Sequence, residues 1–241
     1  MLDILERFGL SLLIGQFPHG PLGGIALTLA MSATALVLAF PLAILVALAR
    51  EATWRPVRRA AAVYVYAVRG IPLLLLIFWA YFVLPLLTGL DAPASVTVVA
   101  ALVVYQGAYL GEAIRGAIRA LPPGQAEAAR ALGLGYWRTI YWVILPQALF
   151  NCLPSIVNQF ILLVKDTSLA YIVGAHEATF AATQINAQLL TKPLQVYVIL
   201  AGIYFLLCYT LSRLSRMLER RVVRRRARPA ASQPSFSEAS A

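Results

Sequence analysis

Long apolar stretches separated by shorter polar segments dominate the pattern along this chain. A helix that crosses the ~30 Å hydrocarbon core of a bilayer needs about 20 residues, and each stretch is long enough. The pattern therefore predicts five membrane-spanning helices, over residues 22–49, 60–87, 95–114, 147–174 and 193–217. They make up a predicted transmembrane domain at 22–218, with a segment at 1–21 before it and a tail at 219–241 after it.

Two of the polar segments interrupt or join these spans in an informative way. Arg69 lies about ten residues into the second span, and ten residues of helix are roughly 15 Å long. Gly70 and Pro72 beside it favour a break in the helix. The connection at 119–146 is a polar insert between spans, and its glycines and alanines predict two short helices joined at a glycine, Gly133 or Gly135, with Pro146 ending the second.

Composition supports a membrane protein independently of the pattern. Apolar residues make up 61% of the chain and charged residues 12%, with a mean hydropathy of +0.77. These values exclude a soluble single-core fold, which would have nowhere to bury so much apolar surface. Cys152 and Cys208 both lie in apolar stretches without metal-ligand spacing, so we interpret them as small buried side chains.

The distribution of basic residues predicts an orientation. Sixteen of the twenty lie in the first loop, in the loop around 119–146 and in the tail from Arg213 to Arg228. Since cytoplasmic loops carry the excess of Lys and Arg, these segments are predicted to be cytoplasmic and the N-terminal segment 1–21 periplasmic. The net charge of +10 then reflects orientation and contact with anionic membrane lipid, and not nucleic-acid binding. The tail 219–241 is predicted to be disordered.

The spacing within the 119–146 loop resembles the EAA loop of ABC importer permeases. The motif begins with Glu127-Ala128-Ala129, and Gly133 follows after a spacer of three residues. After nine more residues comes Val143, where the family usually has Ile, and one residue later the motif ends with Leu145-Pro146. The flanking segments GEAIRGAIRALPPGQAEAA and LLVKDTSLAYIVG, with VRGIP at 68–72, are similar to permeases for polar amino acids, and most like those for glutamate and aspartate. The resemblance covers about residues 20–220.

The resemblance implies an all-α membrane protein with five transmembrane helices in the type I ABC importer permease (MetI-like) fold, in a bacterial inner membrane. It also implies that the loop docks on a dimer of ATPase subunits, which would use ATP and Mg²⁺, whereas this chain would bind no cofactor. Its only lysines, Lys165 and Lys192, follow Val164 and Thr191, so it lacks a P-loop. Further implied partners are a second permease chain, alike or related, and a periplasmic or lipid-anchored binding protein. The implied ATPase contacts are Glu127, Ala128, Ala129, Gly133, Leu145 and Pro146.

Charges inside the spans are candidates for a substrate pathway, because an ionisable residue in the bilayer costs at least ~2.5–3.5 kcal/mol and usually faces protein or water. An arginine and an aspartate would complement the carboxylate and ammonium of an amino acid. The candidates are Arg69, Gln106, Tyr109, Lys165, Asp166, Thr167 and Ser168. An equally weighted alternative is an Arg69–Asp166 or Lys165–Asp166 ion pair that only holds helices together. For Glu112, an ion pair with Arg115 is the favoured interpretation.

Two other function classes stay open from the sequence. An intramembrane enzyme would need a nucleophile–base pair or a metal cluster in the spans, and the sequence shows neither. An ATP-independent secondary amino-acid transporter or a channel would also explain the spans and the charges within them. It would not explain the spacing of the 119–146 loop.

Overall fold

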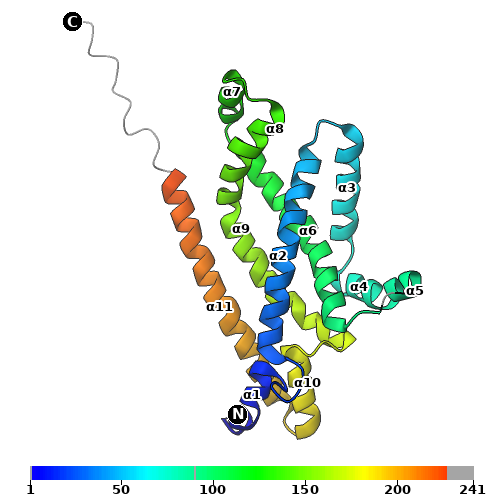
Figure 1. Cartoon of the computed structure of the whole chain (residues 1–241). Helices are drawn as coiled ribbons and strands as arrows, with labels where there is room; N and C mark the ends of the chain where they lie inside the picture. The colour runs from blue at the N-terminus through cyan, green and yellow to red at the C-terminus, as the bar shows by residue number, and fades with distance from the viewer. Residues whose placement is uncertain (1, 90, 227–241) are drawn as a thin grey trace, which may run out of the picture.

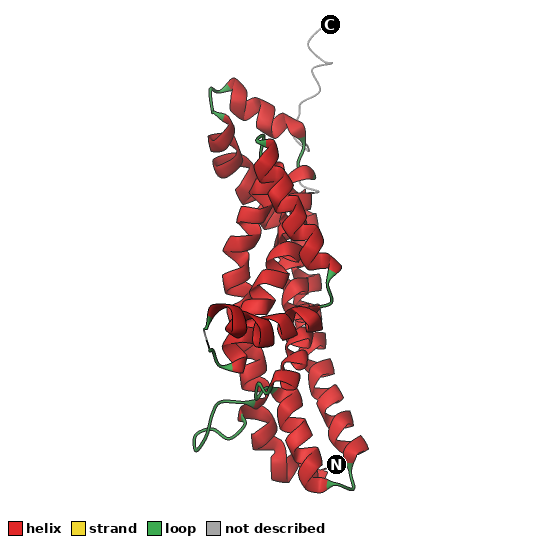
Figure 2. Cartoon of the chain, turned by 90° about the vertical axis from the view of Figure 1, so that its right-hand side faces the viewer, coloured by secondary structure: helices red, strands yellow, loops and turns green. Residues whose placement is uncertain are grey.

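The computed structural model describes residues 2–89 and 91–226, and helices account for the regular structure in these ranges apart from isolated bridges (Figure 2). The α-helices are α1 Leu2–Ile14, α2 Gly24–Glu51, α3 Arg55–Gly70, α4 Leu73–Phe78, α5 Leu84–Thr88, α6 Ala94–Arg119, α7 Pro123–Ala131, α8 Tyr136–Arg138, α9 Leu145–Asp166, α10 Ala178–Leu189 and α11 Pro193–Arg226. Two π-helical segments, η1 Trp79–Val83 and η2 Thr139–Ile144, and one 3₁₀ segment, η3 Thr167–Val173, complete the order. The prediction of an all-helical protein is confirmed.

Four helical runs of the described chain are long and apolar enough to cross a membrane, and a bent pair makes a fifth. The bent pair is α3 with the run Leu73–Thr88, which turn by 104° at the Gly70–Pro72 break. The predicted second span is thus interrupted at the residues that favoured a break, and its second half projects sideways from the bundle as α4 and α5 (Figure 1).

Pro146 does not end a helix, contrary to the prediction. The helical run continues from Tyr136 to Val173 through α8, η2, α9 and η3. A proline lacks the N–H donor of the α-helical ladder, and its ring crowds the carbonyl one turn before it. The π-helical η2 ends two residues before Pro146, and η1 ends two residues before Pro85 in the same way. A locally widened turn therefore accommodates each proline without ending the helix.

Packing between α2 and α6 forms the centre of the bundle. A Cβ built on Gly107 would lie 2.6 Å from the side chain of Leu42, and one on Gly111 would lie 2.9 Å from Val46. These two glycines, four residues apart in α6, therefore let α2 approach α6 closely, as small residues at this spacing do in membrane proteins.

The C-terminal end of α11 differs from a second prediction. The tail from residue 219 was expected to be disordered, but α11 continues as a helix to Arg226. Helix propagation adds a hydrogen bond for each residue fixed, and arginine is a good helix former, so a 25-residue span extends readily into a basic segment. Residues 227–241 lie outside the described residues.

The elements divide between two ends of the bundle (Figure 1). α7 and the α2–α3 connection lie at one end, and α1 and α10 lie at the other. The basic first loop and the basic 119–146 loop thus share an end, in line with the arginine distribution. That this end is cytoplasmic stays a prediction; we refer to the α1–α10 end below as the outer end.

A buried carboxylate holds the outer end together. Glu177 is 0% exposed and accepts hydrogen bonds from the backbone N–H groups of Thr179 and Phe180 at 2.9 and 3.0 Å, which caps α10. It also accepts from the hydroxyls of Tyr204 in α11, at 3.0 Å, and of Thr28 in α2, at 3.4 Å. One side chain therefore ties three helices together.

We expect Glu177→Ala to lower the free energy of unfolding by about 2 kcal/mol, the upper range for loss of an N-cap. The loss stays moderate because Tyr204 retains the Thr179 hydroxyl at 3.3 Å as a partner. The melting temperature of the purified protein in detergent measures this effect. Asp91→Ala removes an exposed acid and should leave that temperature unchanged; equal effects of the two changes would contradict the capping role.

The same carboxyl group predicts a pH dependence. Burial raises the pKa of Glu177, against the opposing effect of the hydrogen bonds that it accepts. The folded state then holds the proton to a higher pH than the unfolded state, so stability falls as the pH rises from about 4.3 through the raised pKa. Glu177→Gln cannot titrate, so the wild type should lose melting temperature relative to this variant over that pH window. A constant difference would contradict the prediction.

Candidate functional site

The loop between α6 and α9 has the geometry of a protruding docking element. α7 ends at Ala131, and Gly133 then adopts a left-handed conformation with φ of +82°. Its N–H donates to the carbonyl of Arg130 at 2.9 Å, and the N–H of Leu134 donates to that of Ala129 at 3.2 Å, which closes the helix end. The chain then reverses into α8, so the predicted pair of helices joined at a glycine is confirmed.

The predicted ATPase contacts are divided between the two sides of this loop. Glu127, Ala128 and Pro146 are exposed, whereas Ala129 and Leu145 are buried against the chain itself and support the loop from inside. Leu132 is 84% exposed beside the turn, although the sequence analysis did not single it out. An apolar residue directly before a turn glycine in a polar loop was the signal that could have identified it.

A network of ion pairs anchors the base of the loop. Glu112 of α6 accepts from Arg115 at 2.7 Å and from Arg50 of α2 at 3.0 Å. Glu51 of α2 accepts from Arg119 at 2.7 Å, and its backbone carbonyl accepts from the hydroxyl of Tyr136 in α8 at 3.1 Å. The favoured interpretation of Glu112 as an ion-pair residue is confirmed, and the network joins α2 and α6 to the start of the long α8–α9 run.

We expect Glu112→Gln to destabilise the protein by about 1–2 kcal/mol, because two guanidinium groups that are less than one-fifth exposed lose their shared carboxylate. Thermal unfolding in detergent measures the effect. Arg119→Ala is the matched control, because the Arg119 side chain is 60% exposed and exposed pairs contribute little. A larger effect of Arg119→Ala would contradict this assignment.

A second polar cluster lies at the break between α3 and α4. The guanidinium of Arg69, at the end of α3, lies 5.0 Å from the ring centre of Tyr109 in α6. The hydroxyl of Tyr109 accepts from that of Tyr105 at 3.2 Å. Asp166 is the last residue of α9. The helix break therefore brings a cation next to two phenols, and we call Arg69, Tyr105 and Tyr109, with Asp166 as a candidate fourth member, the break cluster.

The surroundings of the break cluster help to decide between a substrate pathway and an ion pair that only holds helices together. Among the described residues, no ion pair within 4.0 Å joins Arg69 or Lys165 to Asp166. Arg69 is exposed at the helix break and has an aromatic ring as its neighbour. A self-neutralised Arg69–Asp166 pair is not the arrangement that this structure shows, so both groups are available to a ligand.

The other predicted pathway residues lie in different environments. Gln106 is 2% exposed, and its side-chain oxygen has no hydrogen-bond partner within the described chain. The Thr167 hydroxyl is buried and donates to the carbonyl of Val164 at 2.9 Å, which is a local helix contact. Lys165 and Ser168 line a separate hollow against α11, beside Tyr204 and Cys208. The predicted set thus does not form one site.

Comparison with known proteins places these features in a family. Residues 39–224 match the family described as "Binding-protein-dependent transport system inner membrane component". The L-cystine transport system permease protein TcyB of Bacillus subtilis is 38% identical, over 84% of this chain and 86% of TcyB. The inner membrane amino-acid ABC transporter permease protein YhdY of Escherichia coli is 37% identical, over 83% of this chain and 55% of YhdY, so the chain spans about half the length of that relative.

Solved structures show the same fold. A crystal structure titled as an amino acid ABC transporter with histidines superposes with a TM-score of 0.79 at 30% identity, covering 91% of this chain and 97% of that one. The inward-facing MetNI methionine ABC transporter superposes with a TM-score of 0.61 at 22% identity, covering 90% and 97%. The predicted MetI-like fold is confirmed, and the chain belongs to the family of binding-protein-dependent transport system inner membrane components.

Proposed function

We propose that this chain is the permease subunit of an ATP-driven ABC importer that moves a polar amino acid delivered by a solute-binding protein. The observation that carries the proposal is the α7–Gly133–α8 loop. It has the EAA spacing, it turns at a left-handed glycine, and it lies at one end of a bundle with the family fold. Relatives named as amino-acid permeases support the substrate class.

The loop supplies the mechanical connection in this proposal. Glu127, Ala128 and Leu132 are exposed on it, and they would meet a cleft of an ATPase subunit that uses ATP and Mg²⁺. Closure of two such subunits would pull the loops of two permease chains, alike or related. The Glu112 network and the continuous run from Tyr136 to Val173 would transmit that movement into the membrane. In this arrangement the loop faces the cytoplasm and α1 faces the outside.

The narrower substrate proposal is glutamate or aspartate. The free guanidinium of Arg69 at the helix break would suit an acidic substrate. BztC of Rhodobacter capsulatus, 36% identical over 89% of this chain and 51% of BztC, is named for glutamate, glutamine, aspartate and asparagine. Other relatives are named for cystine and for glutamine, and these are the competing substrates to test.

Reconstitution in proteoliposomes tests the proposal. The chain would be purified with the ATPase, any second permease and the binding protein encoded beside it, and uptake of radiolabelled amino acids would be followed with and without ATP. We expect uptake only with ATP and the binding protein, and stronger competition by unlabelled glutamate or aspartate than by glutamine or cystine. Uptake by the permease chain without ATP would instead support a secondary transporter or a channel.

A further inference from the structure

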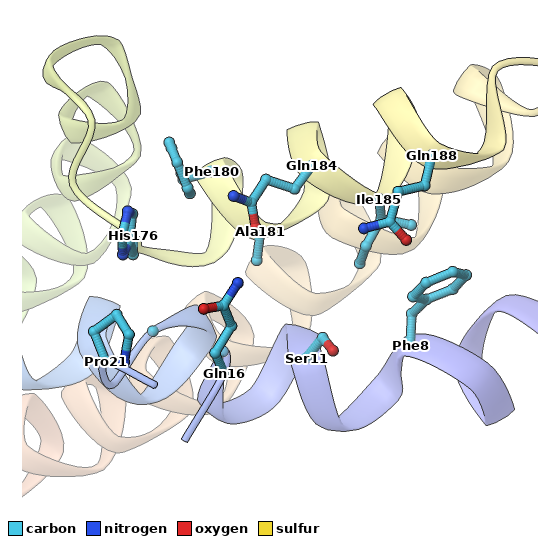
Figure 3. Close-up of a pocket in the computed structure, with 12 residues that line it drawn as sticks. Phe8, Ser11, Gln16, Pro21, His176, Phe180, Ala181, Gln184, Ile185 and Gln188 are labelled. Carbon is cyan, nitrogen blue, oxygen red and sulfur yellow. The ribbon is translucent and has the colours of Figure 1, made fainter. Parts of the chain in front are cut away.

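A cavity at the outer end of the bundle is separate from both sites described above. It has a volume of about 150 Å³ and lies between α1, the turn at 15–23 and α10. Figure 3 shows the amides of Gln16 and Gln184 directed toward each other across it, with Gln188, Ser11 and Phe8 further along the same channel. The volume equals the liquid volume of about five water molecules, so only a small ligand or part of one fits.

The walls of this cavity are held by close backbone packing. The N–H of Gly24 donates to the carbonyl of His176 at 2.9 Å, and that of Gly23 donates to Ile14 at 3.0 Å. A Cβ on Gly15 would lie 2.6 Å from the Cα of Gly23, so the turn at 15–23 tolerates no side chain at that position. The carboxylate of Glu177 holds the start of α10. The cavity is therefore formed before any ligand arrives, which reduces the entropy lost on binding.

The side chains that line the cavity are uncharged, and several of them are amides. The described residues that line the cavity include three glutamines, a serine and a histidine but no Asp, Glu, Lys or Arg. The amides of Gln16, Gln184 and Gln188, all on exposed residues, make no hydrogen bond within the described chain and can exchange water for a ligand. Each amide offers both donors and an acceptor, and Phe8 and Ile185 supply apolar contact. A charged group that enters would find no counter-charge among the described lining residues.

We propose that this cavity binds a primary carboxamide on a short apolar stem, of which free glutamine and asparagine are the small-molecule examples. The ligand carboxamide would lie between Gln16 and Gln184, donating to one amide oxygen and accepting from the other amide nitrogen. Its methylene groups would lie against Phe8 and Ile185, with its α-amino and α-carboxylate groups at the mouth. Such a site would give the outer end of the bundle its own ligand preference. Binding at the site does not depend on the proposed function, whereas any role of the site in amino-acid import does.

Ligand titration of the full chain in lipid nanodiscs, without ATPase or binding protein, tests the inference. Saturation-transfer NMR would measure binding of glutamine and asparagine, with glutamate and aspartate as charged analogues of matched shape. For ligands of this size we expect a Kd on the order of 1 mM. Glutamate and aspartate should bind at least about tenfold more weakly, because no cationic side chain lines the cavity.

Variants locate the binding. Gln16→Leu and Gln184→Leu should each weaken glutamine binding about two- to tenfold, the loss expected for one neutral hydrogen bond. Ala187→Leu is the control, since it introduces the same residue at an exposed position of α10 outside the cavity, and it should have no effect. Gln184→Lys should reverse the preference toward glutamate.

Absence of saturable glutamine binding, or equal effects of Gln184→Leu and Ala187→Leu, would overturn the inference. If the cavity binds only a carboxamide on a side chain of another protein, the free amino acids will not bind. That result also overturns the proposal, which is for a small-molecule ligand. Saturable binding without ATP-driven uptake would instead count against the proposed function alone. ATP-driven uptake without binding by the isolated chain would leave the proposed function standing and overturn only this inference.

Discussion

Replacing Gly133 with valine should lower ATP-driven uptake by roughly 5- to 150-fold while leaving the membrane spans inserted. Gly133 has φ of +82°, a conformation that a β-branched residue adopts only with strain of about 1–3 kcal/mol. The turn would open to relieve this strain, and α7 would lose its position relative to α8. That free energy corresponds to roughly a 5- to 150-fold weaker docking equilibrium with the ATPase, and an uptake cycle that depends on docking should fall accordingly. Co-purification of the ATPase and uptake in proteoliposomes measure the two effects.

A neighbouring glycine provides the matched control for this prediction. Gly135 has φ of −65° and ψ of 162°, an extended conformation open to any residue, and nothing lies within 4 Å of a Cβ built on it. The space around Gly133 is equally open, so the two positions differ in backbone conformation and not in crowding. Gly135→Ala should therefore keep nearly full uptake. Normal ATPase association in Gly133→Val would show that the turn is not needed for coupling.

The backbone breaks of this fold were predictable where glycine and proline act through local sterics. The turn at Gly133 and the break at Gly70–Pro72 both follow from the conformations that these residues favour or forbid. Pro146 was misjudged, because a proline ends a helix only when the preceding turn cannot widen. The π-helical η2 segment, which no residue pattern identifies, provides that widening.

Contacts between residues far apart in the sequence explain why the surroundings of the candidate site residues could not be predicted. Arg69, Tyr109 and Asp166 were singled out as charges and polar groups within spans, and the fold places the guanidinium of Arg69 over the Tyr109 ring of another helix. Lys165 is adjacent to Asp166 in sequence but lies on another face of the helix, against α11. The burial of Glu177 depends on the approach of α2 and α11, and the residues next to it in the sequence do not indicate that approach. Side-chain direction around a helix axis decides such assignments.

Arg69→Ala should reduce ATP-driven uptake of the substrate by about 10- to 150-fold, the loss expected when a charge-assisted hydrogen bond of about 1.5–3 kcal/mol disappears. The physical reason is that the guanidinium of Arg69 is exposed at the helix break and has no acidic partner among the described residues. It can therefore bind a substrate carboxylate without first breaking an ion pair. Uptake rates over a range of substrate concentrations measure the change, with complex assembly checked by co-purification.

Two further variants separate this role from a purely structural one. Arg69→Lys keeps the charge but loses the planar group that lies over Tyr109, so its uptake should fall between those of the wild type and Arg69→Ala. Arg59→Ala removes an exposed arginine from the same helix and should transport normally. Asp166→Asn removes the candidate acid at the end of α9 and should weaken the site for the ammonium group in the same assay. Normal uptake affinity and rate in both Arg69→Ala and Asp166→Asn would assign the break cluster to helix packing, because a substrate site cannot lose its cation and its acid without effect.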